Sequence, residues 1–264
     1  MPVLQYFLPG SSDVDWCETN YARSKYLAEY YNTISNAGFL ALPALAIYLF
    51  RSYSKHVTSS IDVIWILLIV VGLGSAYFHG TLSFAGQLID ELAIAWVLLA
   101  SFAIWTPKRM LPEIFRRDRR KLAQIVTVAG VLTTLLAFIK PIVNSFVLLS
   151  ISIPIAVILC IEMQRCRDER AWRVLQTSVL LLVAALAAWL SDKFCCSLWL
   201  SLGFPYLHSV WHLLILGSAY LASVLCAYLY ALQETPHLKP RIVFWPSWLG
   251  SGIPYVQIVE SIAT

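Results

Sequence analysis

The sequence has 264 residues, of which 59% are hydrophobic and only 13% are charged, and its mean hydropathy is +0.71. A soluble globular domain carries about a quarter of its residues as charged side chains, so this composition excludes that class and favours an integral membrane protein. The net charge of +4 is small for a chain of this length and indicates no nucleic-acid partner.

Residues 1–29 precede the first long apolar run and are expected to lie outside the membrane. They lack the basic flank and apolar core of a cleavable signal peptide. The segment instead carries several oxygen-bearing side chains: Asp13, Asp15, Glu18, Asn20 and Glu29. Oxygen-rich clusters suit a hard cation such as calcium. A solvated acidic loop that caps a helix would have the same composition, and composition alone favours that alternative.

Seven apolar runs are close to the roughly 20 residues that a helix needs to cross a bilayer. Because backbone polar groups in lipid must be satisfied locally, each run is expected to be helical. The sequence therefore predicts an all-α membrane protein with seven transmembrane helices, at about 30–50, 62–81, 86–106, 122–139, 141–161, 174–192 and 206–232. The connections are short, so residues 30–232 are expected to form one helical bundle, followed by a tail at 233–264.

The basic residues predict the orientation of the chain. When the segments between the runs are assigned alternately to the two sides, 15 of the 19 Lys and Arg residues fall on one side. Positive charge marks the cytoplasmic side. The N-terminus is therefore expected in the lumen or outside the cell, and the tail at 233–264 in the cytoplasm. The basic loop at 107–121 is expected to contact anionic lipid.

Four polar residues stand in otherwise apolar helices: His79, Asp90, His208 and His212. His208 and His212 are four residues apart, which places both rings on one face of a helix. The predicted topology puts all four residues near the luminal ends of helices two, three and seven. Ionisable side chains at membrane depth are costly and usually mark a site. A His pair could instead hydrogen-bond neighbouring helices, but the third His and the Asp favour a metal centre.

Three neutral imidazoles and an open position are typical of catalytic zinc, which lowers the pKa of a bound water to about 7. Asp90 could orient or deprotonate that water and later pass the proton to a leaving amine. Ser75, one turn from His79, could donate a hydrogen bond to an oxyanion on an attacked carbonyl. A helix serine more commonly bonds its own i−4 carbonyl, and the residues alone favour that role.

Three of the six cysteines, Cys17, Cys195 and Cys196, fall on the predicted luminal side, where disulfides persist. A bridge from Cys17 to either of the other two would hold the acidic segment over the mouth of the bundle. No pair has the CxxC spacing of a metal site.

Six segments carry a resemblance to a known family: DWCETN at 15–20, AEYYNTISN at 28–36, SAYFHGTLSFAGQLIDE at 75–91, WLSDKFCC at 189–196, FPYLHSVWH at 204–212 and FWP…GIPYV at 244–256. Together they resemble the alkaline ceramidases, in a superfamily of seven-span membrane hydrolases that includes the adiponectin-type receptors. The stretch RRDRRKLAQIVTVAGVLTTLLAFIKPIVNS is most similar to the Golgi-type alkaline ceramidase. That similarity implies the Golgi membrane, with the endoplasmic reticulum membrane as the alternative.

The resemblance implies hydrolysis of the amide of ceramide to sphingosine and a free fatty acid. It implies zinc bound by His79, His208 and His212, with Asp90 acting on water and Ser75 at the reaction centre. It also implies a calcium site in the N-terminal segment, and this implication outweighs the solvated-loop interpretation. Asp13 would not belong to the site. The ligands would be Asp15, the Trp16 carbonyl, Glu18, Asn20 and Glu29. For the disulfide, the family pattern favours Cys17 with Cys196.

The main alternative is an adiponectin-receptor-like seven-transmembrane receptor with a structural or weakly hydrolytic zinc site. Such receptors should have the opposite orientation, which the charge distribution opposes. A G-protein-coupled receptor is disfavoured because the third run ends without a DRY-like triplet and the seventh lacks NPxxY. A transporter is disfavoured because no pair of Gly/Pro-interrupted runs is present.

Overall fold

The computed structural model describes residues 3–111, 113–115, 118–140, 142–247 and 252–258. Within these ranges, seven helical segments are long and apolar enough to cross a membrane: Tyr30–Leu49, Ser60–Thr81, Phe84–Trp105, Arg119–Ile139, Phe146–Arg165, Glu169–Phe194 and Leu207–Glu234. Each coincides with one of the predicted runs, apart from a few residues at the ends. The predicted class, an all-α protein with seven membrane-spanning helices, is therefore confirmed.

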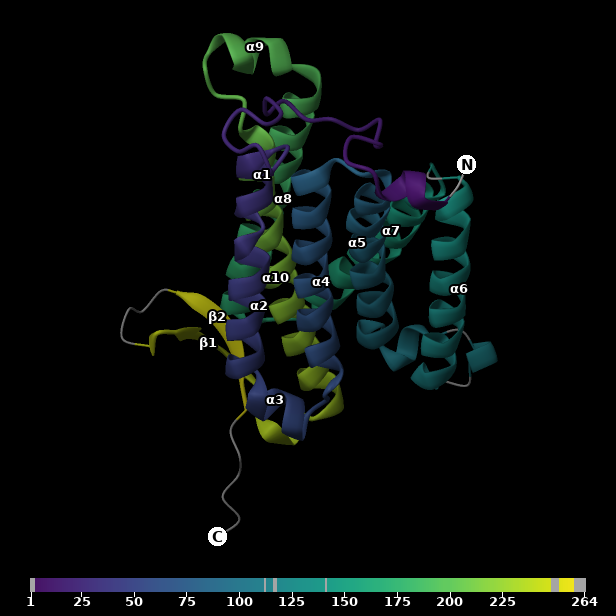
Figure 1. Ribbon diagram of the computed structural model, residues 1–264. Helices are drawn as coiled ribbons and strands as arrows, with labels where there is room; N and C mark the ends of the chain where they lie inside the picture. Colours follow the sequence, from purple (N-terminus) through teal and green to yellow (C-terminus); the bar gives the residue numbers. More distant parts are fainter. Residues whose placement is uncertain (1–2, 112, 116–117, 141, 248–251, 259–264) are drawn as a thin grey trace. The chain divides into compact units, whose positions relative to one another are not determined.

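The described chain forms helices almost throughout (Figure 1). The α-helices are α1 (Tyr30–Ser35), α2 (Ala37–Leu49), α3 (Arg51–His56), α4 (Ser60–Thr81), α5 (Phe84–Trp105), α6 (Arg119–Ile139), α7 (Ile142–Arg165), α8 (Glu169–Phe194), α9 (Cys196–Ser201) and α10 (Leu207–Glu234). Short 3-10 helices occur at Val3–Phe7, Lys108–Met110, Glu113–Phe115 and Pro236–Leu238. Two strands, β1 (Arg241–Trp245) and β2 (Ile253–Gln257), pair antiparallel, with Val243 opposite Tyr255.

The first span is divided into α1 and α2 at Asn36. The side chains of Ser35 and Asn36 both donate to the Asn32 carbonyl, over 3.0 and 2.9 Å. Side-chain donors of this kind compete with the backbone pattern of a helix. The division leaves α1 as a separate short helix directly after the N-terminal segment.

The chain divides into two compact units. The first comprises Met1–Leu42, Leu68–Ile94 and Thr177–Ala219, and the second comprises Pro43–Leu67, Ala95–Gln176 and Tyr220–Thr264. All of the site residues named from the sequence belong to the first unit.

In the first unit, the N-terminal segment completes the end of α4. The last carbonyls of a helix have no partner within the helix and need donors from elsewhere. Here three of them accept backbone amides of the N-terminal segment over 2.9–3.1 Å: His79 from Glu29, Gly80 from Ala28 and Thr81 from Gly10. The N-terminal segment is therefore fixed to the turn of α4 that carries His79.

A close approach between α4 and the start of α5 lies beside this turn. A Cβ on Gly86 would meet the Cα of Phe78 at 2.8 Å, so only glycine allows this separation without displacement of the backbone. Phe78 also packs with Ala28 and Leu82 in a buried cluster, against which Trp16 of the N-terminal segment is placed. The cluster fixes the position of α4 relative to the segment.

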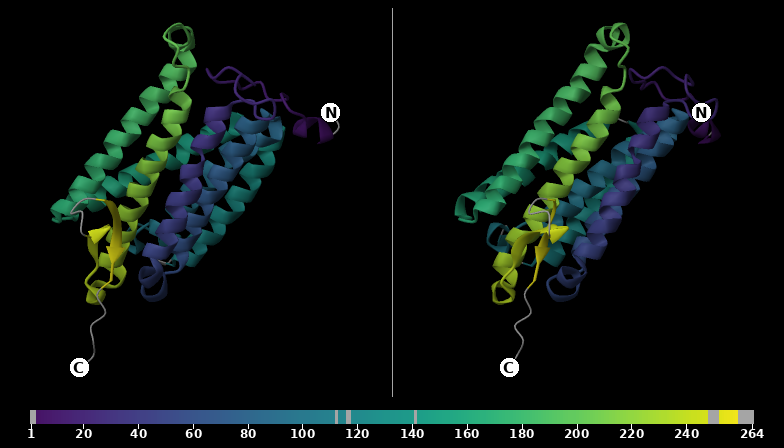
Figure 2. Two further views of the ribbon diagram at one scale, coloured as in Figure 1. Left: turned by 60° about the vertical axis from the view of Figure 1, so that its left-hand side comes forward. Right: turned by 90° about the vertical axis from the view of Figure 1, so that its left-hand side faces the viewer.

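The parts of α8 and α10 in the first unit run side by side in opposite directions, joined through α9 (Figure 2). Ser178 and Ser218 link them, since each hydroxyl donates to the carbonyl of the other residue over 2.9–3.0 Å. A disulfide between Cys17 and Cys196 joins the N-terminal segment to the start of α9, with the two Cα atoms 5.3 Å apart. This is the pairing that the family resemblance implies.

The second unit has its own core, in which the Phe50 ring packs against those of Tyr53 and Trp65, and all three side chains are fully buried. The hairpin of β1 and β2 was not anticipated from the sequence, which gave residues 233–264 only as a tail. It packs against the helices of this unit, since the Tyr220 hydroxyl donates to the Pro254 carbonyl over 2.7 Å.

Candidate metal centre

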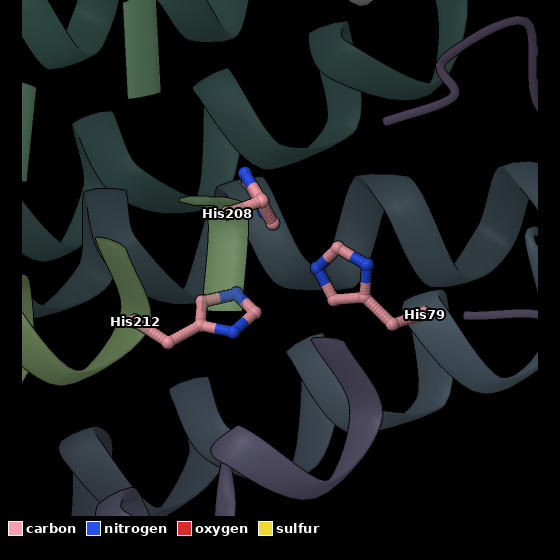
Figure 3. Close-up of side chains that lie close together, drawn as sticks. All are labelled: His79, His208 and His212. Atoms are coloured by element: carbon pink, nitrogen blue, oxygen red, sulfur yellow. The ribbon is translucent and has the colours of Figure 1, made fainter. Parts of the chain in front are cut away.

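Three imidazoles meet inside the first unit. His79 is in the last turn of α4, and His208 and His212 are in the first two turns of α10. Their ring centroids are 4.8–4.9 Å apart in all three pairs, and each residue is at most 2% exposed. Figure 3 shows the three rings around a common space, one from α4 and two from α10.

The donor atoms of this triad fit a metal ion. One ring nitrogen from each histidine lies within 4.8 Å of the other two, and no other group of three His, Cys, Asp or Glu residues meets this condition within the described residues. Nε2 of His79 and Nδ1 of His208 are buried without any hydrogen-bond partner in the described structure. A buried polar atom without a partner is costly. A divalent cation that prefers nitrogen ligands, such as zinc, would remove that cost.

Ser75 lies between the triad and Asp90. The Ser75 hydroxyl oxygen is 3.4 Å from Nε2 of His212, and the Ser75 side chain also interacts with the carboxyl of Asp90. The carboxyl of Asp90 does not belong to the group of side chains that could hold a metal ion. The arrangement therefore places an acidic side chain and a hydroxyl beside the triad, where they could act on a molecule bound there.

Two of the imidazoles are oriented by the residues around α1. Nδ1 of His79 is hydrogen-bonded to the fully buried carboxyl of Glu29, directly before α1. Nδ1 of His212 lies 2.7 Å from the Ser35 hydroxyl, in the last turn of α1. Metal-binding histidines usually use their second ring nitrogen in this way, which fixes the ring orientation.

The ring of His208 is instead held by stacking and by its backbone. The ring of Trp16 stacks on the His208 imidazole, with the two ring centroids 3.7 Å apart. The ring of Trp211 also stacks on this imidazole, at a centroid distance of 4.9 Å. The backbone amide of His208 donates to the carboxyl of Asp192 in α8 over 3.3 Å. The same carboxyl accepts the amide of Cys17 over 3.1 Å. Asp192 thus connects α10 to the N-terminal segment.

One acidic residue of the N-terminal segment, Glu29, contacts the triad, and Asp15 and Glu18 bond to neighbouring residues of the segment or of α1. Asp15 accepts hydrogen bonds from the Asn20 side-chain amide over 3.1 and 3.2 Å. Glu18 uses both carboxylate oxygens to cap α1, since it accepts the amides of Tyr31 and Asn32 over 2.8 Å. Glu29 also accepts the Trp16 amide over 3.0 Å.

Burial raises the pKa of the Glu18 carboxyl and raises that of Glu29 to about 8, because a charged carboxylate loses solvation inside the protein. Oδ1 of Asn20 is buried without a hydrogen-bond partner in the described structure. A cation bound among these oxygens would stabilise the charged carboxylates and satisfy this atom.

Sequence reasoning did not identify Asn32, Ser35, Asp192 and Trp211 as parts of the site. Two features of the sequence could have pointed to three of these residues. The first is the family resemblance, because Asn32 and Ser35 lie in its segment AEYYNTISN and Asp192 lies in its segment WLSDKFCC. Asp192 is also an acidic residue within a span, and such residues usually face a functional interior.

A family model described as Ceramidase matches residues 8–257 of this chain. The chain belongs to the ceramidase family. It is 45% identical over 255 residues to "Alkaline ceramidase" of Drosophila melanogaster, an alignment that covers 96% of this chain and 90% of the relative. It is 39% identical to "Alkaline ceramidase 1" of Mus musculus, in an alignment that covers 95% of this chain and 92% of the relative. It is also 39% identical to "Alkaline ceramidase 1" of Homo sapiens, in an alignment that covers 94% of each chain.

The resemblance stated from the six segments is therefore confirmed, and the chain is an enzyme of this family. The match extends over both compact units. It includes the N-terminal segment from residue 8 onward, all three histidines and both strands of the hairpin.

Proposed function

We propose that this chain is a zinc-dependent alkaline ceramidase, an N-acylsphingosine amidohydrolase that cleaves ceramide to sphingosine and a free fatty acid. The observation that carries this proposal is the buried triad of His79, His208 and His212, with two ring nitrogens that have no protein partner in the described structure. Within an amide-hydrolysing family, such a triad is best explained as a catalytic metal centre.

When bound, zinc would supply positive charge that makes water more acidic and polarises a carbonyl. Asp90 would accept the proton of the attacking water and return it to the amine that leaves when the amide bond breaks. Ser75 would donate its hydroxyl hydrogen to the amide oxygen as negative charge develops there. Its position next to both Asp90 and His212 supports this role.

We further propose calcium as a structural or regulatory ion bound by Asp15, the carbonyl of Trp16, Glu18, Asn20 and Glu29. The raised pKa of two of these carboxyls and the buried, unsatisfied Asn20 oxygen support a cation at this position. Glu29 is also hydrogen-bonded to His79, so calcium bound by Glu29 would affect the orientation of a zinc ligand through a single side chain.

The substrate is expected to reach the site from the membrane. Ceramide has two long chains and a small polar head, so it stays in the bilayer. We propose that the N-terminus faces the lumen and the tail faces the cytoplasm, as the basic residues predict. Water and calcium would then enter from the luminal side. The proposed location is the Golgi membrane, with the endoplasmic reticulum as the alternative.

Metal analysis of the purified protein, combined with sphingosine release from ceramides of several chain lengths, tests the proposal. We expect stoichiometric zinc and turnover in the natural chain, and loss of both in His212→Ala. His237→Ala is a matched control because this exposed histidine lies far along the sequence from the triad, in a 3-10 helix at Pro236–Leu238. Full turnover by His212→Ala would overturn the mechanism. Zinc without turnover in the natural chain would favour the receptor-like alternative.

The calcium proposal is tested separately with Asp15→Ala. We expect its activity to respond less to added calcium than that of the natural chain, with zinc content unchanged. Asp13→Ala, which removes an exposed acidic residue of the same segment, should keep the natural response. An unchanged calcium response in Asp15→Ala would contradict the site.

A further inference from the structure

The contact of His212 with Ser35 forms one part of a longer hydrogen-bond chain. The Ser35 hydroxyl oxygen lies 2.7 Å from Nδ1 of His212 and 3.0 Å from the carbonyl oxygen of Asn32. His212 and Asn32 are both at most 1% exposed. The hydroxyl therefore joins two buried groups, a ring nitrogen and a backbone carbonyl.

A serine hydroxyl has one hydrogen to donate, while its oxygen can also accept. The Asn32 carbonyl can only accept, so its contact with Ser35 requires the hydroxyl hydrogen. The contact with His212 is then a hydrogen bond only if Nδ1 carries a hydrogen and donates it to the Ser35 oxygen. A neutral imidazole has one N–H, so Nε2 of His212 must hold the free lone pair.

We propose that Ser35 is a positioning residue that selects the Nδ1–H tautomer of His212 and so directs its Nε2 lone pair into the histidine triad. This inference rests on the zinc site of the proposed function. The opposite tautomer would turn the Ser35 hydrogen toward Nδ1 and leave a hydrogen on Nε2, which could then not bind a metal. The position of Nε2 agrees with the proposal, because this atom faces Ser75 at 3.4 Å, on the side of Asp90.

Asn32 connects Ser35 to both helices that carry the triad, α4 and α10. Its side-chain amide donates to the Glu29 carboxyl over 3.0 Å, and that carboxyl contacts Nδ1 of His79. Its side-chain oxygen accepts the hydroxyl of Ser209, in α10 between the two histidines, over 2.7 Å. The turns around α1 thus contact histidines from both α4 and α10, and Asn32 is the residue that links the two contacts.

The tautomer can be read directly. In metal-free, full-length protein labelled with 15N-histidine, the ring nitrogen that carries hydrogen is distinguished by its chemical shift, and the spectrum of His212→Gln assigns the signals of His212. We expect the Nδ1–H tautomer in the natural chain and a mixture of tautomers in Ser35→Ala. Ser35→Thr keeps the hydroxyl and should restore the natural spectrum. If Ser35→Ala keeps the natural tautomer, the inference is overturned.

Zinc affinity is the second readout, measured by competition with a chelator. Loss of an outer hydrogen bond to a ligand typically weakens metal affinity about 10- to 100-fold, and we expect this range for Ser35→Ala, with recovery in Ser35→Thr. Ser52→Ala is a matched control, because Ser52 faces Nδ1 of His56 at 3.4 Å in α3, in the second unit. It should bind zinc as the natural chain does.

The outcomes separate this inference from the proposed function. A natural chain that binds no zinc would overturn both. Zinc binding that is equally tight in the natural chain and in Ser35→Ala would overturn the role of Ser35 and leave the zinc site standing. A loss in Ser35→Ala that Ser35→Thr does not restore would indicate damage to packing and would also overturn the role of the hydroxyl.

Discussion

Trp16 stacks on His208, with ring centroids 3.7 Å apart and 21° between the ring planes. The N-terminal segment therefore forms one wall of the histidine triad, although it precedes the first span. Hydrogen bonds at Nδ1 orient the rings of His79 and His212, whereas the stack with Trp16 orients the ring of His208.

Replacement of Trp16 by Ala should weaken zinc binding, because the His208 ring would lose the neighbour that holds its plane. An aromatic pair contributes about 0.5–1.5 kcal/mol, which corresponds to roughly a 2- to 10-fold change in affinity. Chelator competition measures this change. Trp16→Phe keeps an aromatic face and should lose less. An equal loss in both variants would show that the stack is not the cause.

Asp90→Asn should remove most activity and keep the metal. Asp90 is outside the group of clustered ligand atoms, so zinc content should remain that of the natural chain. Loss of a general base typically lowers the rate about 10²- to 10⁴-fold, and this reduction should appear in kcat. Glu91→Gln is the matched control, because Glu91 is bonded to Gln87 over 2.9 Å. Loss of zinc in Asp90→Asn would contradict this division of roles.

Asp192→Asn should lower thermal stability. The carboxyl accepts backbone amides of Cys17 and His208 with its two oxygens, and an Asn side chain has only one oxygen with which to accept. The loss of one buried hydrogen bond of this kind should cost about 1–3 kcal/mol. Thermal unfolding in detergent measures the effect, with the exposed Asp13→Asn as control. An unchanged unfolding temperature would show that these amides have other acceptors.

Cys17→Ser should release the N-terminal segment from α9. The two cysteines of the disulfide are separated by 179 positions in the sequence. Loss of a native disulfide typically lowers the free energy of unfolding by about 2–5 kcal/mol. Limited proteolysis of residues 10–28 should become faster, and zinc affinity should fall because Trp16 is adjacent. Cys195→Ser is the control, since the thiol of Cys195 is free and exposed. Equal proteolysis in both variants would contradict the role of the bridge.

The sequence alone predicted the class of the protein, which the structure confirms, and a candidate site with the chemistry of a metal centre. Runs of apolar residues predicted seven spans, because the thickness of the bilayer and the rise of a helix together fix how many residues one crossing needs. The four-residue spacing of His208 and His212 predicted a shared helix face, since helical periodicity relates residues close in sequence. Isolated polar residues in apolar runs, such as His79 and Asp90, indicated a site because their burial is costly without a purpose.

Only the tertiary structure decided which distant groups meet. Cys195 and Cys196 are neighbours in sequence, and their different positions at the start of α9 allow only Cys196 to reach Cys17. Likewise, no periodicity connects Ser35 with His212, 177 residues away, or Asp192 with the amide of Cys17. Such contacts depend on how whole helices and loops pack, so local pattern carries little information about them. The orientation of the three imidazoles depends on such contacts, and it became visible only in three dimensions.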